Sequence, residues 1–332
     1  MSEEKLRIAV VGLGKMGLVH ASMLKVLPNV ELAALCEKSS MLRRFLKKAF
    51  RSVPVVSDLE ELSELNLDAV YVTTPIPFHF EVAETIYREK IAKNVFVEKT
   101  LAANFSEAKQ LCTFSEKANG TDMVGYLRRF YVTFAKAKSL LSENAIGHVS
   151  SFKAYAFSSD FLDTRSDEGQ GTSSVSYSKT GVLEDLGCYA IDLAIWYFGD
   201  LGVSSGNGSP EENQQKSVRF KLENGKGLSG TVESSWSIAG FRMPEVGFSI
   251  EGSDGSIDVT DDKVELRTKD GKSPKWYRQN LEDNVRFWLG LPEYFREDEC
   301  FVSSVMKKRR TEPDFASASK VDRIIELVKN GA

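Results

Sequence analysis

The sequence lacks the features of a metalloprotein, a disulfide scaffold, a membrane protein and a nucleic-acid-binding protein. Its 332 residues include only four cysteines and three histidines. The cysteines are far apart, so we expect reduced, mostly buried thiols and no metal site. The longest stretch without a formal charge, Ala69–Phe80, is far too short to span a bilayer. Basic and acidic residues nearly balance at 43 and 47, which gives no attraction to nucleic acid or anionic membranes. We therefore expect a cytoplasmic protein without a signal peptide.

The first 125 residues alternate short apolar runs with amphipathic stretches. Continuous apolar runs favour strands that are buried on both faces, and helical spacing of apolar residues between them favours covering helices. This alternation predicts a doubly wound parallel sheet of the α/β class. The expected strands are Leu6–Val11, Glu31–Cys36, Ala69–Thr74, Asn94–Val97 and Asp122–Leu127, and the expected helices include Lys15–Leu27, Phe80–Lys90 and Ser106–Asn119.

Residues 126–332 have a different pattern and predict a second, α+β domain. Turn dipeptides such as Asn224-Gly225 and Asp254-Gly255 separate short strand-like runs, which indicates a mostly antiparallel sheet. One helix over Val182–Phe198 interrupts the strands, and a last helix covers Ala316–Asn330. The expected strands are Val149–Ser158, Ser217–Leu222, Gly227–Trp236, Val246–Glu251, Gly255–Thr260 and Val264–Thr268.

The segment Gly12-Leu13-Gly14-Lys15-Met16-Gly17 has the pattern G-x-G-x-x-G between a predicted strand and a predicted helix. Glycines at these positions allow a tight turn and a close backbone approach to a pyrophosphate, which the helix N-terminus stabilises. Twenty residues later, Glu37 ends the second strand and can accept both hydroxyls of an adenine ribose. The alternative is a glycine-rich turn followed by an ordinary surface glutamate.

The residues around Glu37 leave the choice of dinucleotide open. A carboxylate here favours NAD, because it repels the 2′-phosphate of NADP. Basic and hydroxyl side chains that follow could instead bind that phosphate, or simply be solvated at the start of a helix. We expect NAD and do not exclude NADP. These following residues are Lys38, Ser39, Ser40, Arg43 and Arg44.

Two further strand ends should line the same crevice as the glycines, because ligands of such sheets bind at the carboxyl ends of the strands. Thr73-Thr74-Pro75 ends one strand, with His79 shortly after it, and Glu98-Lys99 ends the next. Lys99 closes an apolar strand, so it either enters the site or extends to the surface. We interpret His79 as a hydrogen-bonded residue near the cofactor. In the second domain, Asp185 and Tyr189 are four residues apart on the predicted helix and share a face.

These motifs together resemble the Gfo/Idh/MocA oxidoreductases. The resemblance covers nearly the whole chain and includes Ile8–Gly17 followed by His20, Thr74-Pro75, Val97–Lys99, Val124–Phe130 and Gly181–Gly199. It implies an N-terminal Rossmann domain, a C-terminal domain on a large open sheet, and hydride transfer between NAD(P) and a carbinol carbon of a sugar, cyclitol or related polyol.

The resemblance also implies roles for particular residues. Lys99 matches the lysine of the family's E-K-P motif, and Asp185 and Tyr189 match the aspartate and histidine of its D-x-x-x-H motif. Lys99 would then bind the reacting oxygen, Tyr189 would be the acid/base, and Asp185 would hold the neighbouring hydroxyl. Two departures are Thr100 in place of proline and Tyr189 in place of histidine. Expected substrate contacts placed by proximity to matched motifs are Tyr126, Arg128 and Lys179.

Other functions of the same fold remain open at this point. A dinucleotide-binding sensor that does not turn over, or a redox-cycling glycosidase that retains NAD, would show the same motifs. We also expect a homodimer or homotetramer formed through the second-domain sheet, because segments such as Gly227–Trp236 carry more apolar residues than one helical layer covers.

Overall fold

The computed structural model describes residues 5–159, 181–204, 216–282, 285 and 291–331. They form two compact units, which are described separately. Unit 1 comprises residues 1–127 and 285–322, and unit 2 comprises residues 128–284 and 323–332. The segment 285–322 thus belongs with the first unit, whereas the expected division groups it with residues 126–332.

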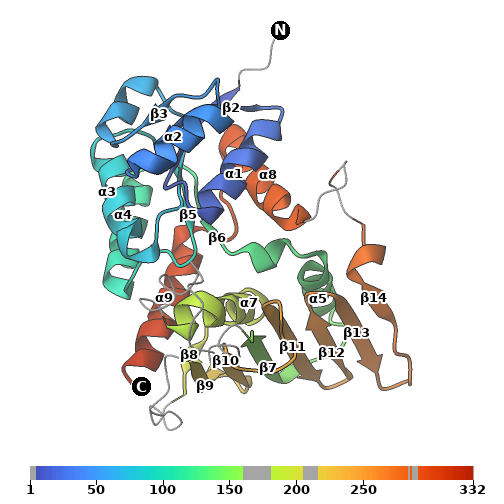
Figure 1. Cartoon of the computed structure of the whole chain (residues 1–332). Helices are drawn as coiled ribbons and strands as arrows, with labels where there is room; N and C mark the ends of the chain where they lie inside the picture. The colour runs from blue at the N-terminus through green and yellow to red at the C-terminus, as the bar shows by residue number, and fades with distance from the viewer. Residues whose placement is uncertain (1–4, 160–180, 205–215, 283–284, 286–290, 332) are drawn as a thin grey trace, which may run out of the picture. The chain divides into compact units, whose positions relative to one another are not determined.

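Unit 1 is built on a parallel six-stranded sheet with the order β3-β2-β1-β4-β5-β6. Figure 1 shows α1 and α8 on one side of this sheet and α3 and α4 on the other. This confirms the doubly wound α/β prediction. The strands are β1 (Leu6–Val11), β2 (Val30–Cys36), β3 (Val55–Val56), β4 (Ala69–Val72), β5 (Asn94–Glu98) and β6 (Asp122–Gly125), and the helices are α1 (Lys15–Val26), α2 (Ser40–Ala49), α3 (His79–Arg88), α4 (Phe105–Ala118), α8 (Pro292–Lys307) and the start of α9 (Phe315–Lys329).

The central strands of unit 1 are buried on both faces, as helices on both sides of a sheet require. Every residue of β4 has zero exposure, and so do Ile8, Ala9 and Val10 of β1. Strands of this kind cannot carry a polar side chain along their length without a partner. Polar chemistry in unit 1 is therefore concentrated where the strands end.

Unit 2 is built on an eight-stranded sheet with the order β14-β13-β12-β11-β7-β10-β9-β8 in the described residues. Only the β10–β7 pair is parallel, which confirms the prediction of a mostly antiparallel open sheet. The strands are β7 (Val149–Phe157), β8 (Gly202–Val203), β9 (Ser217–Glu223), β10 (Ser229–Ser235), β11 (Glu245–Gly252), β12 (Gly255–Thr260), β13 (Lys263–Thr268) and β14 (Lys275–Tyr277).

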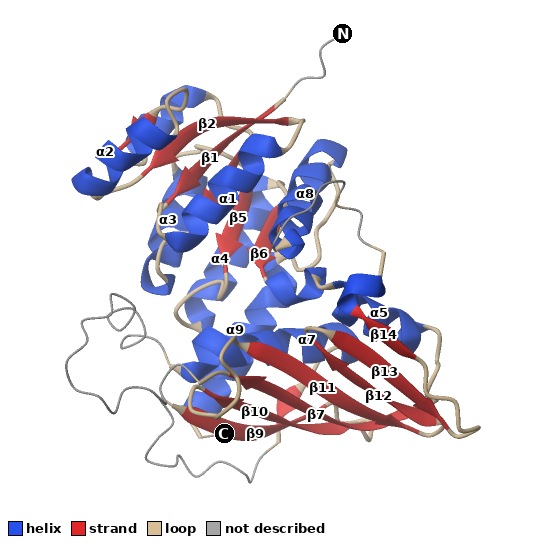
Figure 2. Ribbon diagram, turned by 45° about the vertical axis from the view of Figure 1, so that its right-hand side comes forward, coloured by secondary structure: helices blue, strands red, loops and turns tan. Residues whose placement is uncertain are grey.

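Two helices of unit 2, α5 (Val132–Ser142) and α7 (Cys188–Phe198), cover one face of this sheet (Figure 2). A π-helical turn over Leu183–Gly187 runs directly into α7. The helix expected over 182–198 is therefore present, but its first turn is wider than an α-turn. Such π-turns often occur at functional sites.

Candidate functional site

The glycine-rich turn after β1 is closed tightly on one side and open on the other. Gly12 has φ +88°, and a Cβ there would lie 2.8 Å from Thr74 Cγ2. A Cβ on Gly17 would lie 2.0 Å from the carbonyl oxygen of Gly12. A Cβ on Gly14, in contrast, would meet no protein atom within 4 Å. Two glycines thus allow the turn to pack, while the third leaves room for a ligand against the backbone.

Polar groups beside this turn are suited to a phosphate-containing ligand. The N-cap of α1 is Gly14, whose lack of a side chain leaves the first backbone N–H groups without a side-chain cap. Thr73 Oγ1 donates to the carbonyl oxygens of Val11 and Gly12, at 3.0 and 2.7 Å. Thr74 Oγ1 is buried and has no hydrogen-bond partner among the described residues. An unpaired buried hydroxyl beside an open backbone turn fits a dinucleotide-binding cradle.

Glu37 lies against the glycine-rich turn. Its Oε2 accepts the Leu13 N–H at 2.8 Å, and its Oε1 accepts the Ser39 N–H at 2.8 Å. Arg43 donates to the carbonyl oxygens of Glu37 and Lys38, at 2.8 and 2.6 Å. The guanidinium that sequence reasoning considered for a 2′-phosphate is therefore bound to backbone instead. Of the other expected cradle residues, Lys15 and Lys38 are exposed and Met16 is half-buried.

His79 connects the loops that follow β4 and β5. Its Nδ1 lies 2.7 Å from the Thr100 carbonyl oxygen, and its Nε2 lies 2.7 Å from that of Thr74. Burial lowers the pKa of His79, although both carbonyl groups favour the protonated ring. Pro75 precedes a short 3-10 turn that leads into α3. His79 is thus buried, with one carbonyl oxygen within hydrogen-bond distance of each ring nitrogen, and it lies between two loops at the carboxyl edge of the sheet.

Lys99 lies at this same carboxyl edge, directly after β5. Its side chain is half-buried, and its backbone N–H donates to Glu98 Oε2 at 3.0 Å. Glu98 Oε1 lies 3.0 Å from Nε2 of His20 on α1. The Lys99–Thr100 peptide is cis, and Thr100 is fully buried. Unit 1 therefore brings the glycine cradle, Glu37, His79, Glu98 and Lys99 to one edge of one sheet.

Asp185 and Tyr189, the expected substrate residues of unit 2, are both half-buried. Asp185 belongs to the π-helical turn, and its Oδ2 accepts the indole N–H of Trp236 at 3.0 Å. Tyr189 belongs to the first turn of α7, and the guanidinium carbon of Arg128 lies 5.4 Å from the centre of its ring. The carboxylate thus has a fixed neutral donor, and the phenol has a cation over its face.

Arg128 is almost fully buried within unit 2. It donates to Tyr131 Oη at 2.5 Å and to the Pro244 carbonyl oxygen at 3.1 Å, and it pairs with Asp261 at 3.0 Å. The next residue, Arg129, makes two hydrogen bonds to the fully buried Asp192. Of the other expected substrate contacts, Tyr126 is fully buried in unit 1, and Lys179 lies outside the described residues.

Two groups of buried acids have no motif in the sequence. In unit 2, burial raises the pKa of Asp261 to about 7, against the opposing effect of Arg128. In unit 1, Asp298 on α8 lies 2.7 Å from Nδ1 of His20. A buried carboxylate beside a cation is a common feature of functional sites, and its burial is what the linear sequence does not reveal.

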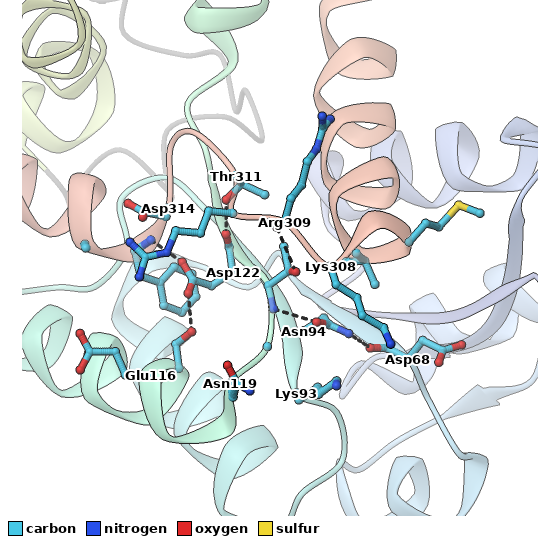
Figure 3. Close-up of a pocket in the computed structure, with 18 of the residues that line it drawn as sticks. Asp68, Lys93, Asn94, Glu116, Asn119, Asp122, Lys308, Arg309, Thr311 and Asp314 are labelled. Atoms are coloured by element: carbon cyan, nitrogen blue, oxygen red, sulfur yellow. Dashed lines mark hydrogen bonds between the residues drawn. The ribbon is translucent and has the colours of Figure 1, made fainter.

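A cavity of about 900 Å³ lies at the amino ends of the strands of unit 1, the edge opposite the cradle (Figure 3). Its polar groups bind one another: Asn94 donates to the Asp68 carbonyl oxygen at 2.7 Å and accepts the Thr121 N–H at 2.8 Å. Asp122 accepts the Phe315 N–H at 2.5 Å. The bond from Phe315 attaches the start of α9 to β6, and the Asn94 bonds link β5 to the residues just before β4 and β6, so we assign the cavity no part in the site.

The described residues contain no cluster of histidine, cysteine and acidic side chains able to hold a metal ion. Within the same part of the chain, no helix has the length and apolar character needed to cross a bilayer.

A doubly wound sheet with an open glycine turn at its carboxyl edge and an acid after its second strand is the arrangement of a dinucleotide-binding protein. Residues 6–126 match the family described as "Oxidoreductase family, NAD-binding Rossmann fold", and residues 134–258 match the "GFO/IDH/MocA C-terminal domain". The chain belongs to the GFO/IDH/MocA oxidoreductase family, and its first unit is an NAD-binding Rossmann domain.

Two of the relatives are inositol dehydrogenases. The chain is 32% identical over 143 residues to myo-inositol 2-dehydrogenase of Thermotoga maritima, a match that covers 43% of this chain and 42% of that enzyme. It is 27% identical over 275 residues to scyllo-inositol 2-dehydrogenase (NAD(+)) of Bacillus subtilis, which covers 77% and 74% of the two chains. The fold is similar to that of levoglucosan dehydrogenase in complex with NADH and levoglucosan, with a TM-score of 0.83, 21% identity and coverage of 99% and 98%.

Proposed function

We propose that this protein is an NAD-dependent dehydrogenase that acts on a carbinol carbon of a sugar, cyclitol or related polyol. The observation that carries the proposal is the placement of Lys99 at the same carboxyl edge of the sheet as the open glycine cradle and Glu37. The chain is similar to two inositol dehydrogenases, and this similarity supports a polyol as the substrate. A sensor of the same fold would need the cradle but not a lysine at this edge.

The nicotinamide of the bound cofactor accepts or supplies the hydride in this proposal. Lys99 donates a hydrogen bond to the reacting oxygen and stabilises the charge that develops there. Tyr189 transfers the proton of that hydroxyl, and Asp185 accepts a hydrogen bond from the neighbouring hydroxyl of the substrate. Two adjacent hydroxyls held at fixed positions would orient one carbon toward the nicotinamide, so we expect a preference for vicinal polyols.

Several cradle residues have a proposed role in holding the cofactor. The N–H groups at the start of α1, from Gly14, Lys15, Met16 and Gly17, and the Thr74 hydroxyl face the pyrophosphate, while Glu37 accepts the ribose hydroxyls. Gly12 and Leu13 shape the turn, because their own N–H groups bond the Cys36 carbonyl oxygen and Glu37. Thr73, Pro75, His79 and Glu98 shape the loops around the nicotinamide half. Tyr126, Arg128 and Lys179 are proposed to complete the substrate side.

The experiment that tests the function is a panel of cyclitols, sugars and sugar acids incubated with NAD or NADP. Appearance of NADH absorbance with a vicinal polyol is the expected result. Tight NAD binding without turnover of any member would indicate a sensor. Cleavage of a glycoside with retained NAD would indicate a redox-cycling glycosidase.

We further propose a cytoplasmic homodimer or homotetramer that forms through the unit 2 sheet. The four cysteines form no disulfide in the part of the chain that the structure describes, as expected of a reducing compartment. Val232 and Trp236 belong to the segment Gly227–Trp236, which was an example behind the oligomer prediction, and both are buried within the unit. The support comes instead from an aromatic cluster of half-buried Tyr155, Phe157 and Phe241, whose ring centres are 4.9 to 6.0 Å apart. Light scattering at micromolar concentration tests the assembly.

A further inference from the structure

The His20 side chain is fully buried between two carboxyl groups of unit 1. Its Nδ1 lies 2.7 Å from Asp298 Oδ1, and its Nε2 lies 3.0 Å from Glu98 Oε1. Carboxylates only accept hydrogen bonds, so the ring satisfies both partners when both nitrogens carry a proton. Burial lowers the pKa of His20, but Asp298 and then Glu98 raise it, and it ends well above its usual range. The ring is therefore a cation that joins α1 to β5 and α8.

Glu98 links the His20 ring to the next residue in the chain, Lys99. Its Oε1 accepts from His20, and its Oε2 accepts the backbone N–H of Lys99 at 3.0 Å. Burial acts to raise the pKa of Glu98, but the bond and charge of His20 and the charge of Lys99 lower it overall. The carboxylate thus stays ionised and is held at both oxygens. Its orientation sets the start of the turn that carries Lys99.

Aromatic side chains from three elements of unit 1 lie around the His20 ring. Tyr71 on β4, Phe96 on β5 and Tyr294 on α8 lie around the ring, with ring centres 5.5, 5.0 and 6.0 Å away. The acid Glu297 on α8 is fully buried and acts on Tyr71. An apolar setting of this kind strengthens the two His20 contacts and makes each costly to break.

We propose that His20 is a positioning residue for Lys99, which it fixes through Glu98, with Asp298 holding the opposite side of its ring. The inference rests on the role proposed above for Lys99. His20 lies three residues beyond Gly17 on α1. The helix whose first amides form the cradle therefore also holds the lysine that meets the reacting oxygen. In this proposal, helix α1 therefore positions both the cofactor and the ammonium group of Lys99.

The test compares His20→Gln with Phe301→Leu. Glutamine keeps a hydrogen-bond donor but carries no charge. Phe301 is fully buried in the same aromatic group, so leucine there lowers stability without altering the charges. We expect His20→Gln to lower kcat roughly 10- to 100-fold, as a displaced catalytic group does. We expect the Kd of NAD and the KM of the polyol to stay within about threefold, a change of less than one decade in affinity. Phe301→Leu should lower the melting temperature and leave kcat and its pH profile unchanged.

A second measurement needs neither cofactor nor substrate. Lysines are ¹³C-methylated, and the Lys99 resonance is assigned by its loss in Lys99→Arg. We expect this resonance, and the pH at which it titrates, to move in His20→Gln and not in Phe301→Leu. If His20→Gln does not fold, Asp298→Asn removes one partner at equal size and should move the resonance as well. An unmoved Lys99 resonance in the folded variant overturns the proposal. A moved resonance in a protein that oxidises no polyol would uphold the positioning role and reject the proposed function.

Discussion

Trp236 donates its indole N–H to Oδ2 of Asp185 across 3.0 Å. This donor is almost fully buried and fixes one oxygen of the carboxylate proposed to bind a substrate hydroxyl. Trp236→Phe keeps an aromatic ring and removes the donor. We expect kcat/KM for the polyol to fall roughly 10- to 100-fold, the effect of losing a hydrogen bond to a charged group. The Kd of NAD should not change. Trp276→Phe, on β14 of the same sheet, is the matched control, and equal losses in both variants would contradict the role.

Gly14 and Gly17 should respond differently to alanine. A Cβ on Gly14 meets no protein atom within 4 Å, whereas one on Gly17 would lie 2.0 Å from the Gly12 carbonyl oxygen. Gly14→Ala should therefore melt like the unmodified protein but bind NAD at least roughly tenfold more weakly, a loss of about 1.4 kcal/mol. Gly17→Ala should unfold at a lower temperature, since overpacking costs about 1–3 kcal/mol or more. Normal NAD affinity in a folded Gly14→Ala protein would mean that the cradle is misassigned.

NAD should bind more tightly than NADP. Glu37 is held beside the glycine turn by the Leu13 and Ser39 amides, and Arg43 is bound to backbone carbonyl oxygens. Isothermal titration with both dinucleotides measures the preference. Glu37→Ala should reduce it, while Glu31→Ala, an exposed acid on the same strand, should not. A tenfold preference for NADP would show that the basic residues after Glu37 govern the site.

Tyr189 is the predicted proton carrier. A free tyrosine has a pKa of about 10, and a nearby cation lowers it by roughly one to three units. Lys99 was the cation expected from the sequence, and Arg128 is a second one, 5.4 Å from the ring centre. Tyr189→Phe should lower turnover about 10²-fold or more with unchanged cofactor affinity. Polyol oxidation should be fastest at alkaline pH, and Tyr189→His should move that optimum downward.

The control for Tyr189→Phe is Tyr197→Phe on the same helix, whose hydroxyl bonds the Phe134 carbonyl oxygen. Loss of that bond affects stability rather than proton transfer, so turnover per folded molecule should persist. Unmodified turnover in Tyr189→Phe would assign the proton to Lys99 or to water instead.

Asp261 should make stability depend on pH. Its folded pKa is about 7, against 3.8 for an unperturbed aspartate, because burial disfavours the charged form. A raised pKa means that the folded state binds the proton more tightly. The stabilising contribution is thus complete below about pH 4 and is lost as the pH rises through 7. In Asp261→Asn, the free energy of unfolding should change less between pH 4 and pH 7 than in the unmodified protein, by up to about 4 kcal/mol. The exposed Glu251→Gln, on β11 of the same sheet, should leave the pH dependence unchanged, and identical slopes in both variants would refute the assignment.

The first unit could be predicted from its sequence in some detail. The predicted Leu6–Val11 strand agrees with the observed bounds, and the helix after the glycines ends one residue from its expected end. Strands that are buried on both faces appear in the sequence as continuous apolar runs, and glycine residues mark the turns that follow them. In the first 125 residues the local sequence preferences agree with the final fold, so short-range patterns are enough to predict most of the strands and helices there.

Helix α8 was missed for a physical reason. It spans Pro292–Lys307, and three acids, Glu293, Glu297 and Asp298, are fully buried on it. Buried acids break the apolar stripe by which an amphipathic helix is recognised. Their partners, such as His20, are distant in sequence, so no local pattern marks them. The same holds for Asp261 and Arg128, whose pairing appears only once the sheet of unit 2 is formed.

Because unit 1 is formed from two separate stretches of chain, its parts are synthesised at different times. Its last strand ends at Gly125, but α8 begins only at Pro292. A ribosome adds about 5–20 residues per second, so the parallel sheet waits on the order of ten seconds for α8. During that interval His20 and Glu98 are made but Asp298 is not. The nascent Rossmann domain therefore completes its buried charge network only after residues 128–284 of unit 2 have been synthesised.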